Sequence, residues 1–324
     1  MKTRISFLAC LLAINLSAAT WTATESPNPD SPGKAVLIKQ DDQLVARFVF
    51  GDGQKKPFLH LYGSEGELLT NGGLDKSGKD TGQFPHHRGI YIGWKITSEL
   101  GTDDLWHLFK GEKMSVRKIH PVKPAADSLT LIAEIDWLSI KPDSNGSHEL
   151  IRETRTHTVS RPDGKRTQVD CHFVLNPVRD LTLGGDLQHA GIHFRASNEA
   201  SKRNKETSYL WEPPLPPGSG KVVSPTFQWA RLQFPIGTRW FSATEINSPR
   251  NPVEELSWRD YGRFGFFFKR DLKKGESLAL DYRFLVGPVE APAELPNKLS
   301  EAQSKTARTQ AQADHDAYAK SLKK

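Results

Sequence analysis

Hydrophobic and polar residues alternate with a period of two along most of this chain. The alternation is clear in SLTLIAEIDWL (128–138) and ELIRETRTHTV (149–159), which are rich in β-branched and aromatic residues. The stretch RPDGKR (161–166) predicts a hairpin turn between two such segments, because Asp-Gly tolerates positive φ. In all, the pattern predicts β-strands over 44–50, 128–138, 149–159, 166–175, 189–195, 262–269 and 277–286.

The last part of the chain follows a different pattern. The stretch SEAQSKTARTQAQADHDAYAK is rich in Ala, Gln and Lys and lacks Gly and Pro, which predicts a helix over roughly 296–322. Strands and helices do not alternate elsewhere, which argues against Rossmann and TIM architectures. We therefore predict an all-β fold, a large antiparallel β-sandwich over residues 35–292, with a C-terminal helical tail over 293–324.

The first residues have the features of a secretory signal peptide. Lys2 and Arg4 precede the apolar run Ile5 to Leu16, and small residues follow it, so we predict a leader over 1–19. The run is shorter than the about 20 apolar residues that span a bilayer, although an uncleaved anchor is the alternative. We expect a periplasmic or secreted protein with no membrane span. The polar, Pro-rich residues that follow predict a linker over 20–34.

Cysteine content and charge narrow the classes further. Cys171 is the only cysteine outside the leader, so no internal disulfide is expected and a large core must hold the fold. Cys171 falls on an apolar strand face, which favours packing over reactivity. The formal net charge is +6, without a dense basic stripe, which argues against nucleic acid as a partner.

Two adjacent histidines and an arginine in FPHHRG form the first candidate site motif. Imidazoles exchange protons near neutral pH, and a guanidinium binds a carboxylate or a developing negative charge. On an extended chain His86 and Arg88 would share one side and His87 would face the other. The alternative is a structural role, in which either imidazole bonds to the backbone in the core.

Two further motifs add imidazoles. DLWH contributes Trp106, whose flat ring suits stacking on a sugar, and His107. In GGDLQHAGIHFR, residues Ala190, Ile192 and Phe194 should face the core. The opposite face should carry the polar residues His189, His193 and Arg195 over Gly191, which would let a ligand or backbone approach closely, with Asp186 preceding the strand.

This spacing argues against a local metal chelate. Four residues of strand span about 13 Å, which separates His189 from His193 too far for one zinc ion about 2 Å from each nitrogen. A metal would need histidines from different strands. We therefore expect no cofactor and no metal ligands, with a metal-dependent enzyme kept as an alternative.

The remaining candidates are a carboxylate and two aromatic residues. Glu153 could serve as a general base or pair with Arg155 on its own strand face. In SWRDYGRFGFFF, Trp258 and Tyr261 could line a pocket, with Arg259 and Asp260 at its rim. The sequence has no GxSxG elbow, phosphate loop, CxxC pair or HExxH helix, which removes the commonest hydrolase, nucleotide-binding and zincin readings.

Several of these motifs together resemble a known family. FPHHRGIYIGW, DLWH, GGDLQHAGIHFR, RDYGRFGFFF and DYRFLVGP, spread over 35–290, resemble the PmoA-like family of uncharacterised exported bacterial proteins. Its common label, methane oxygenase, disagrees with a chain that has no spanning segment after the leader. The family is similar to galactose-mutarotase-like proteins, and that similarity implies a β-supersandwich with carbohydrate on its concave face. No mutarotase motif aligns here, so no mutarotase residue roles are carried over.

The leading hypothesis is an exported carbohydrate-active enzyme, a lyase, hydrolase or epimerase that acts on sugars or oxidised sugar derivatives. The expected catalytic residues are His86, His87, Arg88, His107, Glu153, His189 and His193. The expected substrate-binding residues are Trp106, Asp186, Arg195, Trp258 and Tyr261. Alternatives are a non-catalytic carbohydrate-binding module and a metal-dependent enzyme with His ligands. No feature of the sequence fixes an oligomeric state.

Overall fold

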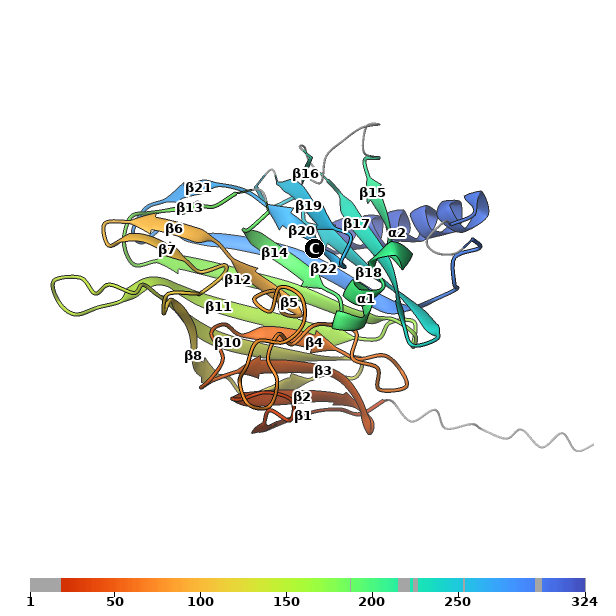
Figure 1. The fold of residues 1–324 in the computed structure, drawn as a ribbon, viewed down its shortest axis with the longest axis horizontal. Coiled ribbons are helices and arrows are strands. Elements are labelled where there is room, and N and C mark those ends of the chain that lie inside the picture. Colours follow the sequence, from red (N-terminus) through yellow and green to blue (C-terminus); the bar gives the residue numbers. More distant parts are fainter. Residues whose placement is uncertain are drawn as a thin grey trace, which may run out of the picture.

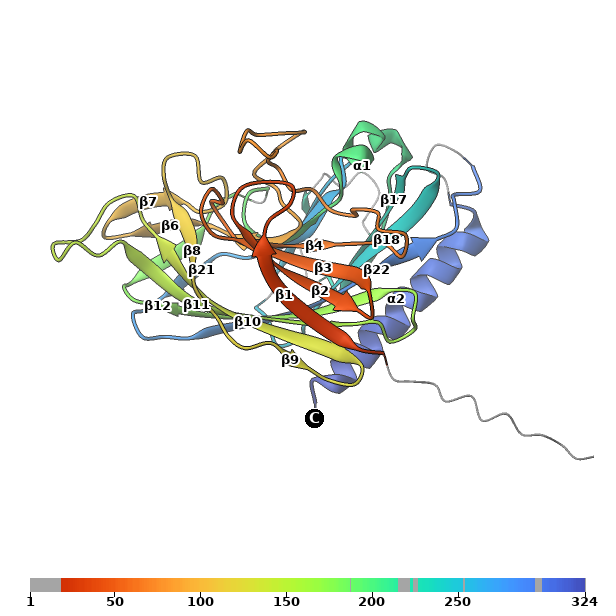
Figure 2. The ribbon, with the colours of Figure 1, turned by 90° about the horizontal axis from the view of Figure 1, so that it is seen from below.

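Strands dominate the structure. A computed structural model of the chain describes residues 19–186, 188–214, 222–223, 227–252, 254–294 and 299–323. The signal peptide predicted over 1–19 lies outside these residues except for its last position. In the described residues the strands form three antiparallel sheets, with a long helix near the C-terminus (Figures 1 and 2). The predicted all-β fold with a C-terminal helix is confirmed.

The first large sheet has nine strands in the order β1-β2-β3-β4-β5-β14-β20-β19-β16. Its strands cover Trp21–Pro27 (β1), Lys34–Gln40 (β2), Gln43–Phe50 (β3), Phe58–Leu61 (β4), Ile90–Gly93 (β5), Gly191–Arg195 (β14), Arg263–Phe267 (β20), Glu255–Arg259 (β19) and Val222–Val223 (β16). Its middle strands therefore come from three separate regions of the sequence.

The second large sheet has the strand order β15-β17-β18-β22-β12-β11-β10-β8, and β9 pairs with β10. Its strands cover Ser208–Glu212 (β15), Trp229–Ile236 (β17), Arg239–Asn247 (β18), Leu278–Val289 (β22), Thr167–Pro177 (β12), Glu149–Ser160 (β11), Ser128–Leu138 (β10), Lys113–Ile119 (β8) and Lys123–Pro124 (β9). The predicted strand 128–138 coincides with β10, and the predicted RPDGKR turn joins β11 to β12.

The smaller elements complete the fold. The third sheet has the order β21-β13-β6-β7, and two short helical segments follow β14. These elements cover Arg270–Leu272 (β21), Leu181–Gly184 (β13), Lys95–Ser98 (β6), Gly101–Asp104 (β7), Asn198–Lys202 (α1) and the 3-10 turn Asn204–Glu206 (η1).

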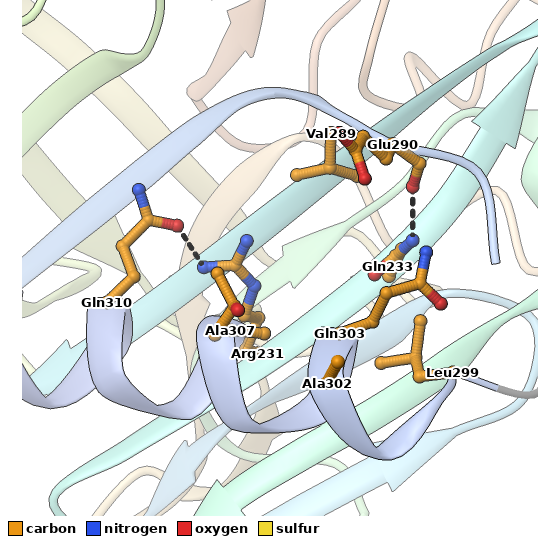
Figure 3. A pocket seen from close by; sticks show the side chains of 10 residues that line it. Arg231, Gln233, Val289, Glu290, Leu299, Ala302, Gln303, Ala307 and Gln310 are labelled. Carbon is orange, nitrogen blue, oxygen red and sulfur yellow. Dashed lines mark hydrogen bonds between the residues drawn. The ribbon is translucent and has the colours of Figure 1, made fainter. Parts of the chain in front are cut away.

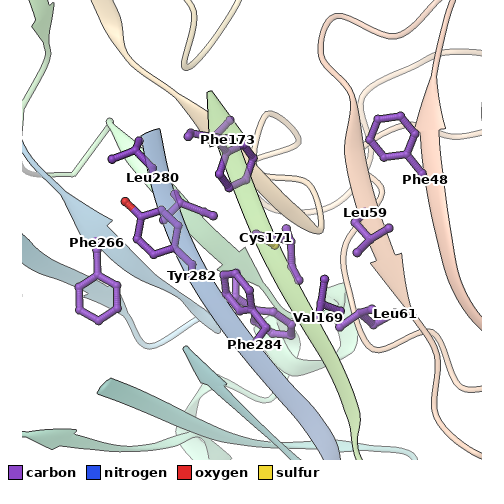
Figure 4. Close-up of a cluster of buried hydrophobic side chains, with 14 of the residues drawn as sticks. Phe48, Leu59, Leu61, Val169, Cys171, Phe173, Phe266, Leu280, Tyr282 and Phe284 are labelled. Atoms are coloured by element: carbon purple, nitrogen blue, oxygen red, sulfur yellow. The ribbon is translucent and has the colours of Figure 1, made fainter. Parts of the chain in front are cut away.

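The core lies between the two large sheets. Phe48 of the first sheet and Phe284 of the second belong to one continuous cluster of buried apolar side chains (Figure 4). The predicted packing role of Cys171 is confirmed, because its side chain is buried in this cluster. Burial raises the pKa of the Cys171 thiol well above its usual value, which keeps the thiol protonated and unreactive.

The linker predicted over 20–34 is wrong in its first half. Residues Trp21–Pro27 form β1, which pairs with β2, and Trp21 is buried. The segment is polar because it is the edge strand of the sheet, where most side chains face water. Alternation of apolar residues is therefore absent, although the backbone is fully paired with its neighbour.

The C-terminal helix α2 covers Glu301–Ser321, within the predicted range. It begins with a capping box in which Ser300 and Gln303 bond each other's backbone N–H groups. Its buried residues Ala311 and Tyr318 pack on Trp229 of the second sheet, so the helix is docked on the fold. No helix within the described residues is long and apolar enough to cross a membrane.

A groove of about 340 Å³ separates α2 from the second sheet. Arg231 of β17 lies in it, 4% exposed, and donates a hydrogen bond to Oε1 of Gln310 at 3.2 Å (Figure 3). Gln233 donates to the backbone carbonyl of Glu290 across the same groove at 2.9 Å. The Arg231–Gln310 bond joins the helix to the sheet, whereas the Gln233–Glu290 bond joins β17 to the segment that follows β22.

Two buried glutamates pack beside the core. Glu245 and Glu254 are both fully buried, and Tyr282 donates a hydrogen bond to Oε1 of Glu254 at 2.5 Å. Burial raises the pKa of Glu254 from 4.5 to about 8, against the opposing effect of the Tyr282 bond. Burial, with the nearby Glu254 carboxyl, also raises the pKa of Glu245 well above its usual value. The folded protein therefore holds these groups protonated where the unfolded chain ionises them.

This pair predicts a stability that falls as pH rises. Because the folded pKa lies above the unfolded one, stability is full below about pH 4.5 and is lost as pH rises through about 8. For Glu254 alone the loss is on the order of 5 kcal/mol. Denaturant unfolding at a series of pH values gives the free energy of unfolding as a function of pH. Its decrease between pH 4.5 and pH 8 should be much smaller in the Glu245→Gln/Glu254→Gln variant than in wild type.

The exposed Glu65 offers the control. Glu65→Gln should retain the pH dependence of the wild-type protein, because its side chain is 72% exposed. An equally steep pH dependence in the double variant would contradict the assignment to Glu245 and Glu254.

Candidate functional site

The site is built on the outer face of the first sheet, opposite the core. Tyr91 of β5, His193 of β14, Gly265 of β20 and Ser257 of β19 are register partners in a row across four neighbouring strands. Because side chains alternate along a strand, the neighbours of His193 in β14 face the core, as predicted for GGDLQHAGIHFR. All four positions of the row are buried, so loops cover this polar face.

Three loops and one hairpin enclose a cavity of about 460 Å³ above this face. The loops precede β5, follow β7 and precede β14, and the hairpin joins β19 to β20. We call this space the histidine cavity. Its lining residues are Gln83, Phe84, His86, His87, His107, Phe109, Gln188, His189, Arg259, Asp260, Tyr261 and Arg263.

The structure brings four imidazoles from three loops into contact. The ring centroids of His86 and His87 are 4.1 Å apart, and those of His86 and His107 are 4.6 Å apart. His107 continues the series, with its centroid 4.7 Å from that of His189. These predicted catalytic residues therefore line one cavity, although about a hundred residues separate His86 from His189 in the sequence.

Two of these imidazoles are oriented by carboxylates three residues before them. His107 Nδ1 lies 2.8 Å from Oδ2 of Asp104, and His189 Nδ1 lies 2.9 Å from Oδ2 of Asp186. Burial raises the pKa of Asp104, but hydrogen bonds from the side chain and backbone of His107 outweigh it and lower the pKa to about 2. Asp104 is therefore ionised and accepts, so Nδ1 of His107 carries the proton and Nε2 is left as the basic nitrogen.

His86 and His87 are held in the neutral form. Burial, with the nearby Lys56 and His107, lowers the pKa of His86 to about 2. Burial, with the nearby Arg263, also lowers the pKa of His87 well below its usual value. His87 is 1% exposed, and neither of its ring nitrogens has a hydrogen-bond partner in the described residues. Such a buried imidazole at a cavity surface is ready to bond a ligand hydroxyl.

The turn at the start of the first motif explains why both histidines face the cavity. Phe84 has φ +56°, and the backbone N–H of His87 donates to its carbonyl at 3.0 Å, which closes a tight turn. The extended geometry predicted for these residues is therefore wrong. Arg88 faces away from the cavity, where its Nε donates to Pro85 O at 3.0 Å and its Nη1 to Gln54 Oε1 at 2.8 Å. Arg88 does not line the cavity and stabilises the loop.

His193 is a positioning residue. Its Nε2 donates to the carbonyl of Ala190 at 2.9 Å, so its Nδ1 accepts a hydrogen bond from Nη1 of Arg263 at 3.0 Å. Both nitrogens are thus engaged, which leaves no free nitrogen for the predicted proton transfer. The ring lies where a side chain at residue 265 would stand, because a Cβ on Gly265 would be 2.7 Å from His193 Cγ.

Gly191 allows β14 to lie very close to the backbone of β20. A Cβ there would lie 1.9 Å from the carbonyl oxygen of Phe266, and its φ is +92°. Between the two predicted alternatives, ligand or backbone, the structure has the backbone of the neighbouring strand β20.

Trp106 and Arg195 support the cavity from beneath. Trp106 is fully buried between His87, Tyr91 and His193, so it cannot stack on a sugar as predicted. Arg195 is fully buried, donates to the carbonyls of Tyr261 and Gln83, and lies with its guanidinium 4.9 Å from the Tyr261 ring centroid. Tyr261 itself lines the cavity, as predicted.

Glu153 and Trp258 lie elsewhere. Glu153 is buried in the core, where it pairs with Arg155 at 2.6 Å and accepts a hydrogen bond from Trp137 at 2.6 Å. Glu153 therefore forms the pair with Arg155 that was the alternative to a role as general base, and it does not line the histidine cavity. Trp258 packs against Tyr209 and Trp211, with ring centroids 5.1 Å apart in each case. Asp186 lies at the rim and reaches the cavity only through His189.

The structure also shows site residues that the sequence analysis left out. Phe84 and Phe109 line the cavity and are 40% and 63% exposed, which is unusual for large apolar side chains. Arg263 lines it from the first residue of β20. Two signals were present in the sequence: Asp104 and Asp186 begin the repeated pattern Asp-Leu-x-His, and Arg263 is the first residue of a strand with the same polar-apolar alternation as β14.

The described residues contain no group of three or more His, Cys, Asp or Glu side chains placed to hold a metal ion. The fold and the site together define a β-sandwich protein with a polar, imidazole-lined cavity on its outer sheet face.

The chain belongs to DUF6807, a family of unknown function, which it matches over residues 35–301. The PmoA-like resemblance inferred from the motifs stays a prediction. No curated protein matches the sequence.

Solved structures with a similar arrangement include a galactose mutarotase related enzyme from Lactobacillus acidophilus. It has 8% identity and a TM-score of 0.37, and the match covers 77% of this chain and 96% of that one. A GalM/aldose epimerase homologue from C. elegans has 12% identity and a TM-score of 0.35, over 84% and 100%. A galactose mutarotase-like protein from Clostridium acetobutylicum has 10% identity and a TM-score of 0.36, over 83% and 99%. Likeness at this level carries no information about a reaction.

Gly265 gives a structural test of the cavity floor. A methyl group there would lie 2.0 Å from the carbonyl oxygen of Ile192 and would displace the His193 ring. Gly265→Ala should lower the free energy of unfolding by about 1–3 kcal/mol, as overpacking does. Denaturant unfolding measures the change.

Gly184 is the matched control. It lies in a strand like Gly265, but a Cβ there would meet only the carbonyl of Lys95, at 3.5 Å. Gly184→Ala should leave stability within about 0.5 kcal/mol of wild type. Equal stability of the two variants would show that His193 does not occupy the space over Gly265.

Proposed function

We propose that this protein is an acid–base enzyme that acts on a sugar or an oxidised sugar derivative in the histidine cavity, by lyase, hydrolase or epimerase chemistry. One observation carries the proposal: His107 and His189 meet in the cavity, and each is bonded through Nδ1 to its own carboxylate. An imidazole held in one tautomer, with Nε2 available for proton transfer, is the usual form of a general base or acid.

The environment of these imidazoles suits proton transfer. Burial lowers the pKa of His189, although Asp186 opposes this effect, so the imidazole is neutral at physiological pH and can accept a proton. Neutral His86, 4.6 Å away from His107 between ring centroids, can accept a hydrogen bond from a ligand hydroxyl or from a protonated neighbour. A hydroxyl-rich ligand would also supply the bonds that His87 lacks.

Two exposed phenyl rings support a ring-shaped, partly apolar ligand. Phe84 and Phe109 both line the cavity. The ring centroid of Phe109 lies 5.1 Å from that of His107 and 5.6 Å from that of His86. The C–H face of a sugar ring stacks on such surfaces while its hydroxyls bond polar groups. The combination of imidazoles and phenyl rings favours carbohydrate over a flexible polar ligand.

A non-catalytic sugar-binding module is the second candidate, because exposed aromatic rings also serve binding alone. The two aspartate–histidine pairs favour catalysis, since binding a sugar does not require a fixed tautomer. We also propose export to the periplasm or the exterior, which the leader motif Lys2 to Ala19 supports.

Loss of His107 should slow turnover strongly. In a screen of the purified protein against oligosaccharides and 3-keto-glycosides, followed by proton NMR, His107→Ala should lower the rate by about 100-fold or more. Asp104→Asn should also lower the rate, because an amide at this position can donate to Nδ1 and favour the wrong tautomer.

His172 and Asp281 provide the control. They form a similar pair, 2.7 Å from Nδ1 to Oδ1, on the second sheet and outside the cavity. His172→Ala should keep the wild-type rate. If wild type binds a sugar without converting any, the protein is a binding module, and if His107→Ala keeps full turnover, His107 is not the acid or base.

Phe109 should contribute to affinity. Phe109→Ala removes one stacking surface without creating a core cavity, because the ring is 63% exposed. The dissociation constant of the sugar should rise about 5- to 20-fold, which corresponds to about 1–2 kcal/mol. Isothermal titration calorimetry gives the constant.

Ile140 is the comparison for this variant. Besides Phe84 and Phe109, it is the one large apolar residue with an exposed side chain in the described residues, at 39%, and it does not line the cavity. Ile140→Ala should bind the sugar as wild type does. Unchanged affinity of Phe109→Ala would rule out stacking on this ring.

A further inference from the structure

Arg263 is a buried cation without an acidic partner. It lines the histidine cavity, is 1% exposed, and forms no ion pair within 4.0 Å with a described carboxylate. Its hydrogen-bond partners are Nδ1 of His193 at 3.0 Å, the hydroxyl of Tyr261 at 3.3 Å and Oγ of Ser257 at 3.2 Å. All three partners are neutral, and together they fix the guanidinium in one orientation.

A charge in this position is costly unless an anion meets it. Burying an unpaired guanidinium forfeits its hydration, and neutral hydrogen bonds replace only part of that free energy. A guanidinium carries five N–H donors, and three bonds to the protein leave two for a ligand. The elements around Arg263 thus hold it rigidly at a cavity surface with donors to spare.

The surroundings do not offset this positive charge. Arg195 and Arg88, buried near the cavity, bond only carbonyl and amide oxygens, and burial lowers the pKa of each only to about 10, so both stay charged.

Few acidic groups face the cavity. Among the described lining residues Asp260 is the one carboxylate, and its Oδ1 accepts the backbone N–H of Tyr261 at 3.1 Å. Asp104 and Asp186 are bonded to their histidines. Arg263 therefore lines the cavity with no carboxylate paired to it among the described residues, and its free N–H donors attract an anion.

We propose that the ligand of the histidine cavity is an anionic sugar, whose oxyanion binds the free N–H donors of Arg263. This inference rests on the proposed function and narrows its substrate class to sugar acids or sulfated sugars, which share this oxyanion. A carboxylate matches a guanidinium with two parallel hydrogen bonds, so a hexuronic acid is the substrate class that we favour.

A carboxylate bound at Arg263 makes proton removal from the neighbouring carbon the reaction that the nearby imidazoles can catalyse. An imidazole Nε2 removes the proton from the carbon next to the carboxylate, and the electron pair of that C–H bond moves into the carboxylate as an enediolate. Arg263 stabilises the added negative charge. Return of a proton to the other face of that carbon gives the epimer. Alternatively, the bond between the next carbon and its oxygen substituent breaks, the imidazolium formed in the first step gives its proton to that oxygen, and the products are an unsaturated sugar acid and a free alcohol.

The test compares glucuronic acid, glucose and glucose 6-sulfate by isothermal titration calorimetry at low salt. Wild type should bind glucuronic acid at least tenfold more tightly than glucose, and added salt should reduce this preference. Arg263→Gln should lose the preference and keep the weaker binding of glucose. Tighter binding of glucose 6-sulfate than of glucuronic acid would support the shared oxyanion and assign it as a sulfate ester.

Arg231→Gln is the matched control. Arg231 is also a buried arginine with a neutral partner, but it lies in the groove under α2, outside the cavity. This variant should keep the preference for glucuronic acid, and thermal unfolding checks that each variant is folded. If Arg263→Gln does not fold, the salt dependence and ligand preference of wild type still decide.

Equal binding of glucose and glucuronic acid by wild type would overturn this inference and leave the proposed sugar chemistry standing. A preference that survives in Arg263→Gln would overturn the role of Arg263. Absence of binding of all three sugars, together with no turnover in the oligosaccharide screen, would overturn both proposals.

Discussion

Burial of a polar sheet face is the constraint on which the functional region depends. The middle strands of the first sheet have the core on one side and loops on the other. The polar side chains buried between the sheet and these loops therefore need hydrogen-bond partners within the protein. His193 meets this need twice, because it donates to Ala190 and accepts from Arg263. The same bonds that satisfy the buried groups also fix the guanidinium at the cavity surface.

Glycine makes this crowded arrangement fit. Without a side chain, Gly265 leaves room for the His193 ring, and Gly191 lets β14 approach the carbonyl of Phe266. Close approach of the strands in turn places Tyr91, His193 and Ser257 in one row. The cavity floor is therefore a consequence of small residues in the strands as much as of the polar residues that surround it.

The same burial sets the electrostatics of the cavity. It keeps the imidazoles of His86 and His87 neutral, while Arg195 stays charged because its pKa starts so high. Neutral imidazoles, which can accept protons, and charged guanidiniums thus lie close together in and around the histidine cavity. The aspartates beside His107 and His189 orient the two imidazole rings.

Local features of the protein follow from the sequence alone. It predicted β10 and the alternation in β14. It also allowed the Glu153–Arg155 pair as the alternative to a catalytic Glu153, because residues two apart on a strand share one face. Which of these faces turn toward the core and which toward the cavity depends on how distant strands pack. The edge strand β1 has no apolar alternation to reveal it, and the turn at Phe84 reverses the expected directions of His87 and Arg88. The meeting of the imidazoles depends on which distant strands become neighbours and in which register, and the packed core fixes both.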